Sequence, residues 1–193
     1  LFIVGLSMTL SLGARAAAGA PRGALLAGMA RRCAVIFGVG LLLNLIPTFA
    51  FETVRIPGVL QRIALASLLA TPIVLACGWR GVLASIGALF ALYSVPMLTV
   101  PVPDASGAVA AGVLEPGRDF GAWIDRALLS GHLWSQSKTW DPEGLWSTLP
   151  AVATVLSGVL AGRWLATDRS AAERTVWLLL AKLTLLWLGD AVD

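Results

Sequence analysis

Six long stretches of the chain carry almost no charge, and they constrain the fold more than any other feature. A helix needs about 20 mostly apolar residues to cross the hydrocarbon core of a membrane. In the whole chain 58% of the residues are hydrophobic and 13% are charged, whereas soluble domains usually carry about 25% charged residues. This composition excludes a soluble globular domain, a disordered chain and a disulfide-rich secreted scaffold. The stretches cover residues 1–14, 33–51, 56–79, 81–103, 144–162 and 175–189.

These stretches predict helices rather than barrel strands, because they lack the alternation of period two that barrel strands show. The sequence therefore predicts an all-α, polytopic membrane helix bundle with about six spans. The chain begins and ends beside apolar stretches. We therefore expect the first and last spans to be truncated and residues 1–193 to be part of a single membrane domain.

The basic residues predict the orientation of the bundle. Three of the predicted connections are rich in arginine, and alternating spans place all three on one side of the membrane. Because basic loops face the cytoplasm, we expect that side to be cytoplasmic and residues 104–143 to form an extracytoplasmic loop. The net charge of +3 is then a signal of topology, and we expect membrane lipids rather than nucleic acid as partners. The arginines are Arg15, Arg22, Arg31, Arg32, Arg80, Arg163, Arg169 and Arg174.

The string R-I-P-G-V-L-Q-R at 55–62 is the most unusual in the chain. Pro57 suits the first turn of a helix, and Arg55 and Arg62 share a helix face if that helix begins early. Together with Gln61, the arginines and the helix N-terminus would suit an anion or a polarised carbonyl. For Arg55 we favour the alternative that it reaches the interface or pairs with an acid, namely Glu52, Asp141 or Glu143.

Arg62 and Gln61 lie about one turn further in, where a pocket-lining role is as well supported as a structural one, because charges inside a membrane usually face a cavity. Asn44, in the second stretch, is polar at moderate depth. We favour an interhelical hydrogen bond for Asn44 over a place in a pocket.

The segment 121–150 holds a second concentration of polar and aromatic residues, including four tryptophans. Trp134 and Trp140 belong either to an aromatic belt at the interface or to a platform on which a sugar ring stacks. His132 is a candidate acid, base or acyl carrier, although a single loop histidine is more often structural. Asp141 and Glu143 suit the orientation of a sugar amine or hydroxyl, a base, or a cap on the helix that follows. One histidine and two isolated cysteines predict no metal site.

Six strings, in order, resemble the heparan-alpha-glucosaminide N-acetyltransferase family and its bacterial relatives. The two most specific are R-I-P-G-V-L-Q-R-I-A at 55–64 and D-P-E-G-L-W-S-T-L-P at 141–150. The others are F-I-V-G-L-S-M at 2–8, G-L-L-L-N at 40–44, W-I-D-R-A-L-L at 123–129 and G-H-L-W at 131–134.

The resemblance implies an integral membrane acetyltransferase that moves an acetyl group from cytoplasmic acetyl-CoA to the amino group of an extracytoplasmic amino sugar. The acceptor is then an amino sugar or another glycan, and the composition indicates a bacterial inner (plasma) membrane. In the family the proposed catalytic histidine lies in the segment before the span that here begins at Leu1. His132 matches a different family position, so the catalytic residue stays unknown, and we expect the chain alone to be inactive.

An alternative function is a transporter or flippase for a sugar-linked lipid, with Asn44, Arg62 and Lys182 along its path. The chain lacks the interrupted helix repeats that many transporters show, so we rank this function second. Either function is compatible with a homo-oligomer.

Overall fold

The computed structural model describes residues 1–47 and 49–190 and is mainly helical, which confirms the predicted all-α class. Its strands are a short antiparallel pair, β1 (Val102–Pro103) and β2 (Val109–Ala110). A single 3-10 turn, η1, covers Phe51–Thr53. The helices are α1 (Phe2–Ala17), α2 (Arg22–Leu45), α3 (Val59–Ala76), α4 (Trp79–Thr99), α5 (Phe120–Leu129), α6 (Thr148–Leu165) and α7 (Ala171–Asp190).

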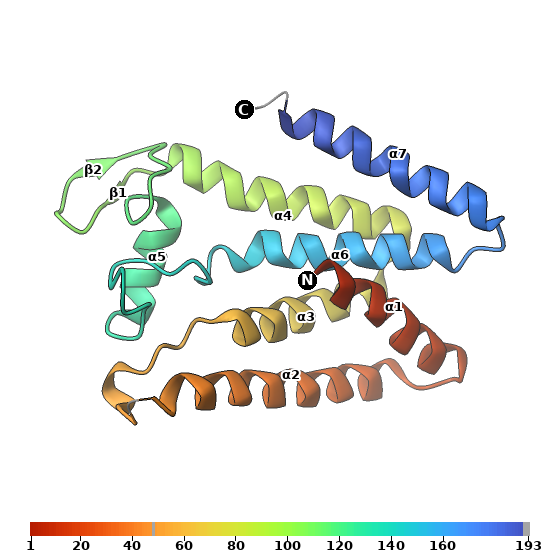
Figure 1. Ribbon diagram of the computed structural model, residues 1–193, viewed down its shortest axis with the longest axis horizontal. Coiled ribbons are helices and arrows are strands. Elements are labelled where there is room, and N and C mark those ends of the chain that lie inside the picture. The colour runs from red at the N-terminus through yellow and green to blue at the C-terminus, as the bar shows by residue number, and fades with distance from the viewer. Residues whose placement is uncertain (48, 191–193) are drawn as a thin grey trace.

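Helix α6 lies at the centre of the bundle (Figure 1). It contacts α1, α3 and α4 along its length, and α2 packs on the outer side of α3. Helix α7 leaves the bundle after a short turn and contacts mainly the end of α6. Ten of the 18 residues of α6 are buried, whereas α4 buries only Val82. The hydrophobic core therefore forms around α6.

Glycines allow α1 and α6 to approach each other closely. A Cβ atom on Gly5 would overlap the backbone of Val155, and a Cβ on Gly158 would overlap the backbone of Phe2. Gly162 follows Gly158 at the spacing typical of tightly packed membrane helices. The Thr9 hydroxyl donates a hydrogen bond of 3.2 Å to the Val159 carbonyl across the same contact. Because the glycines lack side chains, the backbones of α1 and α6 pack directly against each other at this contact.

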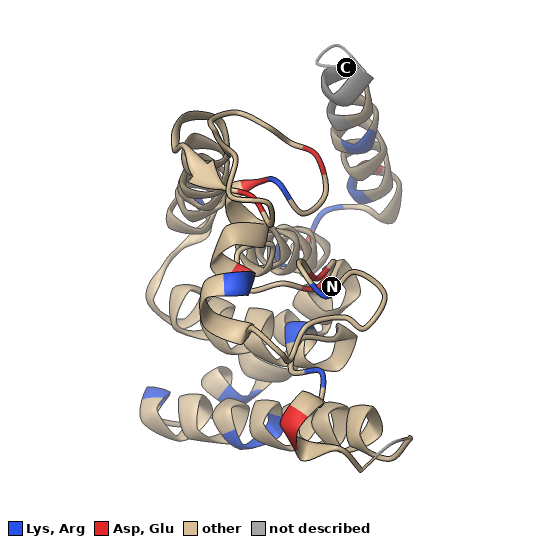
Figure 2. Ribbon diagram, turned by 90° about the vertical axis from the view of Figure 1, so that its left-hand side faces the viewer, with Lys and Arg blue, Asp and Glu red and all other residues tan. Residues whose placement is uncertain are grey.

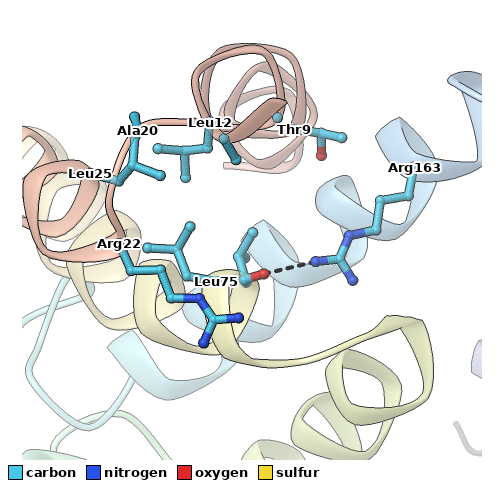
Figure 3. A pocket seen from close by; sticks show the side chains of 10 residues that line it. Thr9, Leu12, Ala20, Arg22, Leu25, Leu75 and Arg163 are labelled. Carbon is cyan, nitrogen blue, oxygen red and sulfur yellow. Dashed lines mark hydrogen bonds between the residues drawn. The ribbon is translucent and has the colours of Figure 1, made fainter. Parts of the chain in front are cut away.

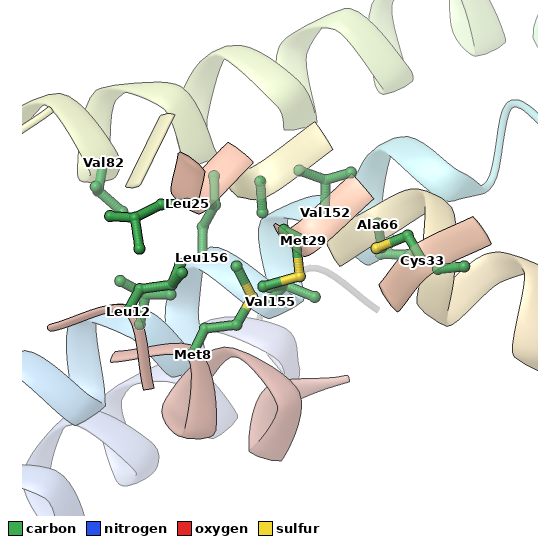
Figure 4. Packing of buried hydrophobic residues seen from close by; sticks show 14 residues of the cluster. Met8, Leu12, Leu25, Met29, Cys33, Ala66, Val82, Val152, Val155 and Leu156 are labelled. Atoms are coloured by element: carbon green, nitrogen blue, oxygen red, sulfur yellow. The ribbon is translucent and has the colours of Figure 1, made fainter. Parts of the chain in front are cut away.

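Around this contact, apolar side chains from five helices fill the interior (Figure 4). Leu156 and Val155 of α6 are fully buried. Met8 and Leu12 of α1 and Met29 of α2 belong to the same buried cluster. By contrast, many large apolar side chains on the outer faces of α2, α4 and α7 are exposed, as expected for helices surrounded by lipid.

Within the described residues, four helices, α2, α3, α4 and α6, are long and apolar enough to cross a membrane. The prediction of about six spans is therefore not confirmed: α1 is apolar but has only 16 residues, and α7 carries Glu173, Arg174 and Lys182. The prediction that the second span begins at Cys33 is wrong, because α2 begins at Arg22. Arginine is a good helix former with a long side chain, so Arg31 and Arg32 lie within the helix rather than in a loop.

The connections fall at two ends of the bundle (Figure 1). The turns at 18–21, 77–78 and 166–170 lie at one end, here called the Arg-rich end. The segments 46–47, 49–58 and 100–147 lie at the opposite end, here called the loop end. The predicted loop 104–143 holds β2 and α5 and joins α4 to α6.

Candidate functional site

The two strings singled out in the sequence meet at the loop end through Arg55. Its guanidinium donates hydrogen bonds to both carboxylate oxygens of Asp141, with Nε–Oδ2 2.8 Å and Nη2–Oδ1 2.6 Å. The same Nη2 donates to Glu143 Oε2 at 2.5 Å. The Asp141 side chain is fully buried, whereas the Arg55 and Glu143 side chains are 25% and 19% exposed. The hydrogen bonds that Arg55 donates to Asp141 and Glu143 raise the pKa of Arg55 above its ordinary value.

The backbone around Arg55 is held from both sides. Asn44 of α2 donates a 2.8 Å hydrogen bond to the Arg55 carbonyl. On the other side, the Ile56 N–H donates to the His132 carbonyl at 2.9 Å, and His132 Nδ1 lies 2.8 Å from the Val54 carbonyl. Because a carbonyl only accepts, Nδ1 carries the proton in this contact. Asn44 and His132 therefore fix the segment that presents Arg55.

Helix α3 begins at Val59, with Gly58 as its N-cap. Pro57 therefore lies before the first turn rather than in it, and the early start that would let Arg55 share a helix face with Arg62 does not occur. Because Ile56 precedes a proline, it favours extended backbone outside the helix. Arg55 and Arg62 consequently do not share a helix face.

Gln61 and Arg62 enter the interior by different routes. Gln61 is 3% exposed, and its side chain fits between Gly40 of α2 and the cap residue Gly58. Arg62 reaches toward α6, where Nη2 donates a 2.8 Å hydrogen bond to the Ser147 carbonyl. Among the described residues, Gln61 Nε2 and Arg62 Nε are buried donors without a hydrogen-bond partner. The first turn of α3 therefore holds two buried donors without a hydrogen-bond partner.

The Asp125 carboxylate of α5 accepts a hydrogen bond from the backbone of Asp141. Asp125 was not among the candidate site residues predicted from the sequence. It is 2% exposed, and its Oδ1 accepts a 2.9 Å hydrogen bond from the Leu145 N–H. Burial raises the pKa of Asp125 to about 6, although hydrogen bonds from the backbone of Leu145 and Asp141 oppose the shift. A Cβ on Gly144 would overlap the Asp125 carboxylate, so the glycine in D-P-E-G is needed for this contact. The string W-I-D-R-A-L-L was the available signal.

Asp141 and Glu143 do not cap α6, which corrects one of their predicted roles. The helix begins at Thr148 after the N-cap Ser147, and Asp141 Oδ1 instead accepts a 2.9 Å hydrogen bond from the Glu143 N–H. This local turn directs both carboxylates to Arg55.

The tryptophans of the loop end form two aromatic groups. Trp134 and Trp140 meet edge to face with centroids 6.0 Å apart, and the Arg55 guanidinium lies 6.0 Å from the Trp134 ring centroid. Phe120 contacts Trp146 and Trp123 in a second group. The first group belongs to the carboxylate cluster, and both groups are half-buried.

The predicted site residues thus separate into a cluster and its supports. Figure 2 views the loop end and shows acidic residues on its connecting segments. Arg55, Asp141, Glu143, Trp134 and Trp140 form what we call the carboxylate cluster, with Asn44 and His132 as backbone supports. Gln61 and Arg62 lie apart from it. Within the described residues, no three His, Cys, Asp or Glu side chains are grouped to hold a metal ion.

A bundle of membrane-spanning helices that assembles a buried ion pair and tryptophans at one end defines an integral membrane protein with a polar site. The sequence profile described as "Heparan-alpha-glucosaminide N-acetyltransferase, catalytic" matches residues 1–190. The chain therefore belongs to this family of membrane acetyltransferases. No curated protein matches the chain.

Proposed function

We propose that this chain contributes to a membrane enzyme that transfers acetyl from cytoplasmic acetyl-CoA to the amino group of an extracytoplasmic amino sugar. The observation that carries the proposal is the family match over residues 1–190. Acetyl-CoA would supply an activated thioester at the Arg-rich end, and the acceptor would bind at the loop end. We assign the Arg-rich end to the cytoplasm on the basis of the positive-inside rule.

In this proposal the carboxylate cluster recognises the acceptor. Asp141 is fully buried and paired with Arg55, so it positions its neighbours rather than touching the sugar. Glu143 is partly exposed and carries a carboxylate that suits an ammonium or a hydroxyl. Trp134 and Trp140 are half-buried beside it, and their faces suit the apolar face of a sugar ring.

The unsatisfied donors of Gln61 and Arg62 suit the acyl-transfer step. When an acetyl group is transferred to an amine, its carbonyl oxygen gains negative charge before the bond to the leaving group breaks, and preorganised N–H donors stabilise that charge. Gln61 Nε2 and Arg62 Nε are buried donors of this kind. We assign them to oxyanion stabilisation, while the acyl-carrying or proton-accepting group stays unassigned.

The test uses sealed membrane vesicles from cells that express the whole protein, with radiolabelled acetyl-CoA on one side and glucosamine on the other. We expect N-acetylglucosamine to form only when the donor is at the Arg-rich end. Replacing Glu143 by Gln should raise the KM for glucosamine, whereas Arg62→Ala should lower kcat by roughly 100-fold. Glu115→Gln is the matched control, because Glu115 is an exposed acid in the same segment.

Two results would overturn parts of the proposal. Undiminished turnover in Arg62→Ala would remove Arg62 from the mechanism. Uptake of a sugar-linked lipid without acetyl-CoA would favour the transporter. Against the transporter stands the placement of two of its proposed path residues, because Lys182 is exposed on α7 while Asn44 binds the backbone between α2 and α3.

A further inference from the structure

A pocket lies at the Arg-rich end, away from the carboxylate cluster. Its volume is about 440 Å³, and it lies between α1, the start of α2 and the ends of α3 and α6. Such a volume suits a small-molecule group. It is lined by Thr9, Leu12, Gly13, Ala16, Ala20, Arg22, Leu25, Val74, Leu75 and Arg163.

Two arginines reach toward this pocket from different helices (Figure 3). Arg22 is the first residue of α2, and Arg163 lies near the end of α6. Arg163 donates three hydrogen bonds, two to the Cys77 carbonyl and one to the Val74 carbonyl at the end of α3. A guanidinium has five N–H donors, so two of them are not used by these bonds. No ion pair in the described part of the chain joins Arg22 or Arg163 to a carboxylate.

The rest of the pocket wall is almost entirely apolar. Leu12 and Leu25 are buried side chains that line the pocket, and Leu75 lines it as well. A smaller cavity of about 200 Å³ shares Leu12 and Leu25 and adds Arg15 and Arg32. The pocket thus presents positive charge at the helix ends and an apolar wall further in. An amphiphile with an anionic head would match both parts.

We propose that this pocket binds the phosphate headgroup of an anionic phospholipid from the surrounding membrane. The phosphate would accept hydrogen bonds from Arg22 and Arg163, and the start of an acyl chain would lie against Leu12 and Leu25. Basic pockets between membrane helices bind such headgroups, and the ends of helices lie at headgroup depth.

The lining favours a lipid over a soluble nucleotide. Its side chains include no aromatic ring on which a purine could stack and no Asn, Gln, Asp or Glu to read the edge of a base. The pocket lining therefore has arginines that can bind a phosphate, but it has no side chain suited to recognise a nucleotide base.

Binding can be measured by native mass spectrometry of the whole purified protein in detergent, titrated with phosphatidylglycerol and, in parallel, with neutral phosphatidylcholine. We expect phosphatidylglycerol to bind roughly tenfold more tightly than phosphatidylcholine. Arg22→Gln should reduce this preference fivefold to tenfold, on the order expected for one arginine at a lipid headgroup. The readout needs no acetyl donor, so its failure and the failure of the proposed function are distinguishable.

A second variant blocks the pocket without removing charge. A Cβ on Gly13 meets no atom within 4 Å, and Gly13 lines the pocket, so Gly13→Leu should fill the space and keep the fold. Gly87→Leu on α4 is its matched control, because a Cβ there also meets nothing within 4 Å. Arg80→Gln controls for charge, since Arg80 lies at the same end and is not among the pocket-lining residues.

We expect Arg22→Gln and Gly13→Leu to lose phosphatidylglycerol while both controls retain it. Equal binding of the two lipids, or unchanged binding in both pocket variants, would overturn the proposal. Inorganic phosphate or CoA that displaces the lipid and binds with higher affinity would identify a soluble ligand and overturn the lipid assignment.

Discussion

The two ends of this bundle use arginine in opposite ways. At the loop end, Arg55 is matched by two carboxylates and an aromatic ring within one compact cluster. At the Arg-rich end, Arg22 and Arg163 face a pocket without carboxylates, and Arg163 binds only backbone carbonyls. At the loop end the carboxylates neutralise the charge of Arg55. At the Arg-rich end the charges of Arg22 and Arg163 have no carboxylate partner among the described residues, so they can attract an anionic ligand.

This difference separates structural arginines from arginines that can receive a ligand. A buried ion pair contributes specificity but collapses when one partner is removed, because the other charge stays buried alone. An arginine at a helix end, with water or lipid headgroups nearby, keeps its charge without a protein partner. Substitutions at the two ends should therefore have very different costs.

The largest effect is expected at Asp141. Asp141→Ala removes two charge-assisted hydrogen bonds from Arg55, which keeps Glu143 as a partner, and should lower the free energy of unfolding by about 3 kcal/mol. Thermal unfolding in detergent measures the loss. Asp168→Ala, an exposed acid at the Arg-rich end, should change the melting temperature little. Equal melting temperatures for the two variants would contradict the distinction between the ends.

The next effect concerns pH and Asp125. Its folded pKa of about 6 lies above the unfolded value of about 3.9, so the folded state binds the proton more tightly. The stability from this group is fully present below about pH 4 and is lost as the pH rises through about 6, by up to about 3 kcal/mol. Asp125→Asn should remove this loss, so the variant should gain stability relative to wild type as the pH rises.

Melting temperatures at about pH 4.5 and pH 7 test this expectation. Asp168→Asn serves as the control, because Asp168 is an exposed acid at the opposite end of the bundle from Asp125. A stability difference between Asp125→Asn and wild type that is constant over this range would show that Asp125 does not titrate there.

A smaller effect should separate two glycines of α2. A Cβ on Gly40, toward the loop end, would come within 2.6 Å of Gln61 Oε1, so Gly40→Ala should cost about 1–2 kcal/mol. Gly28 lies toward the Arg-rich end, where the nearest atom would be Arg15 Nη1 at 3.8 Å. Gly28→Ala should instead stabilise the protein by up to about 1 kcal/mol through helix propensity. Chemical unfolding of the two variants compares them, and equal costs would show that Gln61 moves aside freely.

Two kinds of feature were predictable from the sequence: helices, from long stretches without charged residues, and the site segments, from the two unusual strings. Apolar stretches located the helices because a chain in lipid must satisfy its backbone internally. The strings at 55–64 and 141–150 were correctly singled out, and the structure joins them through Arg55 and Asp141. The preferred interpretation of Arg55 as half of an ion pair is confirmed.

The remaining features depend on tertiary contacts that no local pattern encodes. Arg31 and Arg32 suggested a loop, although a long side chain on a helix can reach the membrane surface. The burial of Asp125 arises only when α5 meets Leu145 and Gly144, some 20 residues later in the chain. The pocket at the Arg-rich end likewise needs α1, α2, α3 and α6 together. The spacing of residues in the sequence predicts where the helices lie, but it does not predict which groups each polar side chain contacts.

The smallest expected effect is at His132 and tests whether this residue is a support or a catalyst. His132→Ala removes the Nδ1 contact with the Val54 carbonyl and should cost about 1 kcal/mol of stability. The Ile56 N–H still donates to the carbonyl of residue 132, so the segment with Arg55 should keep its path. Turnover per folded molecule should then stay within about threefold of wild type, whereas loss of general acid–base catalysis would lower it by roughly 100-fold or more. Acetyl transfer normalised to folded protein measures this effect. A loss of roughly 100-fold would show that His132 takes part in catalysis and is not only a structural support.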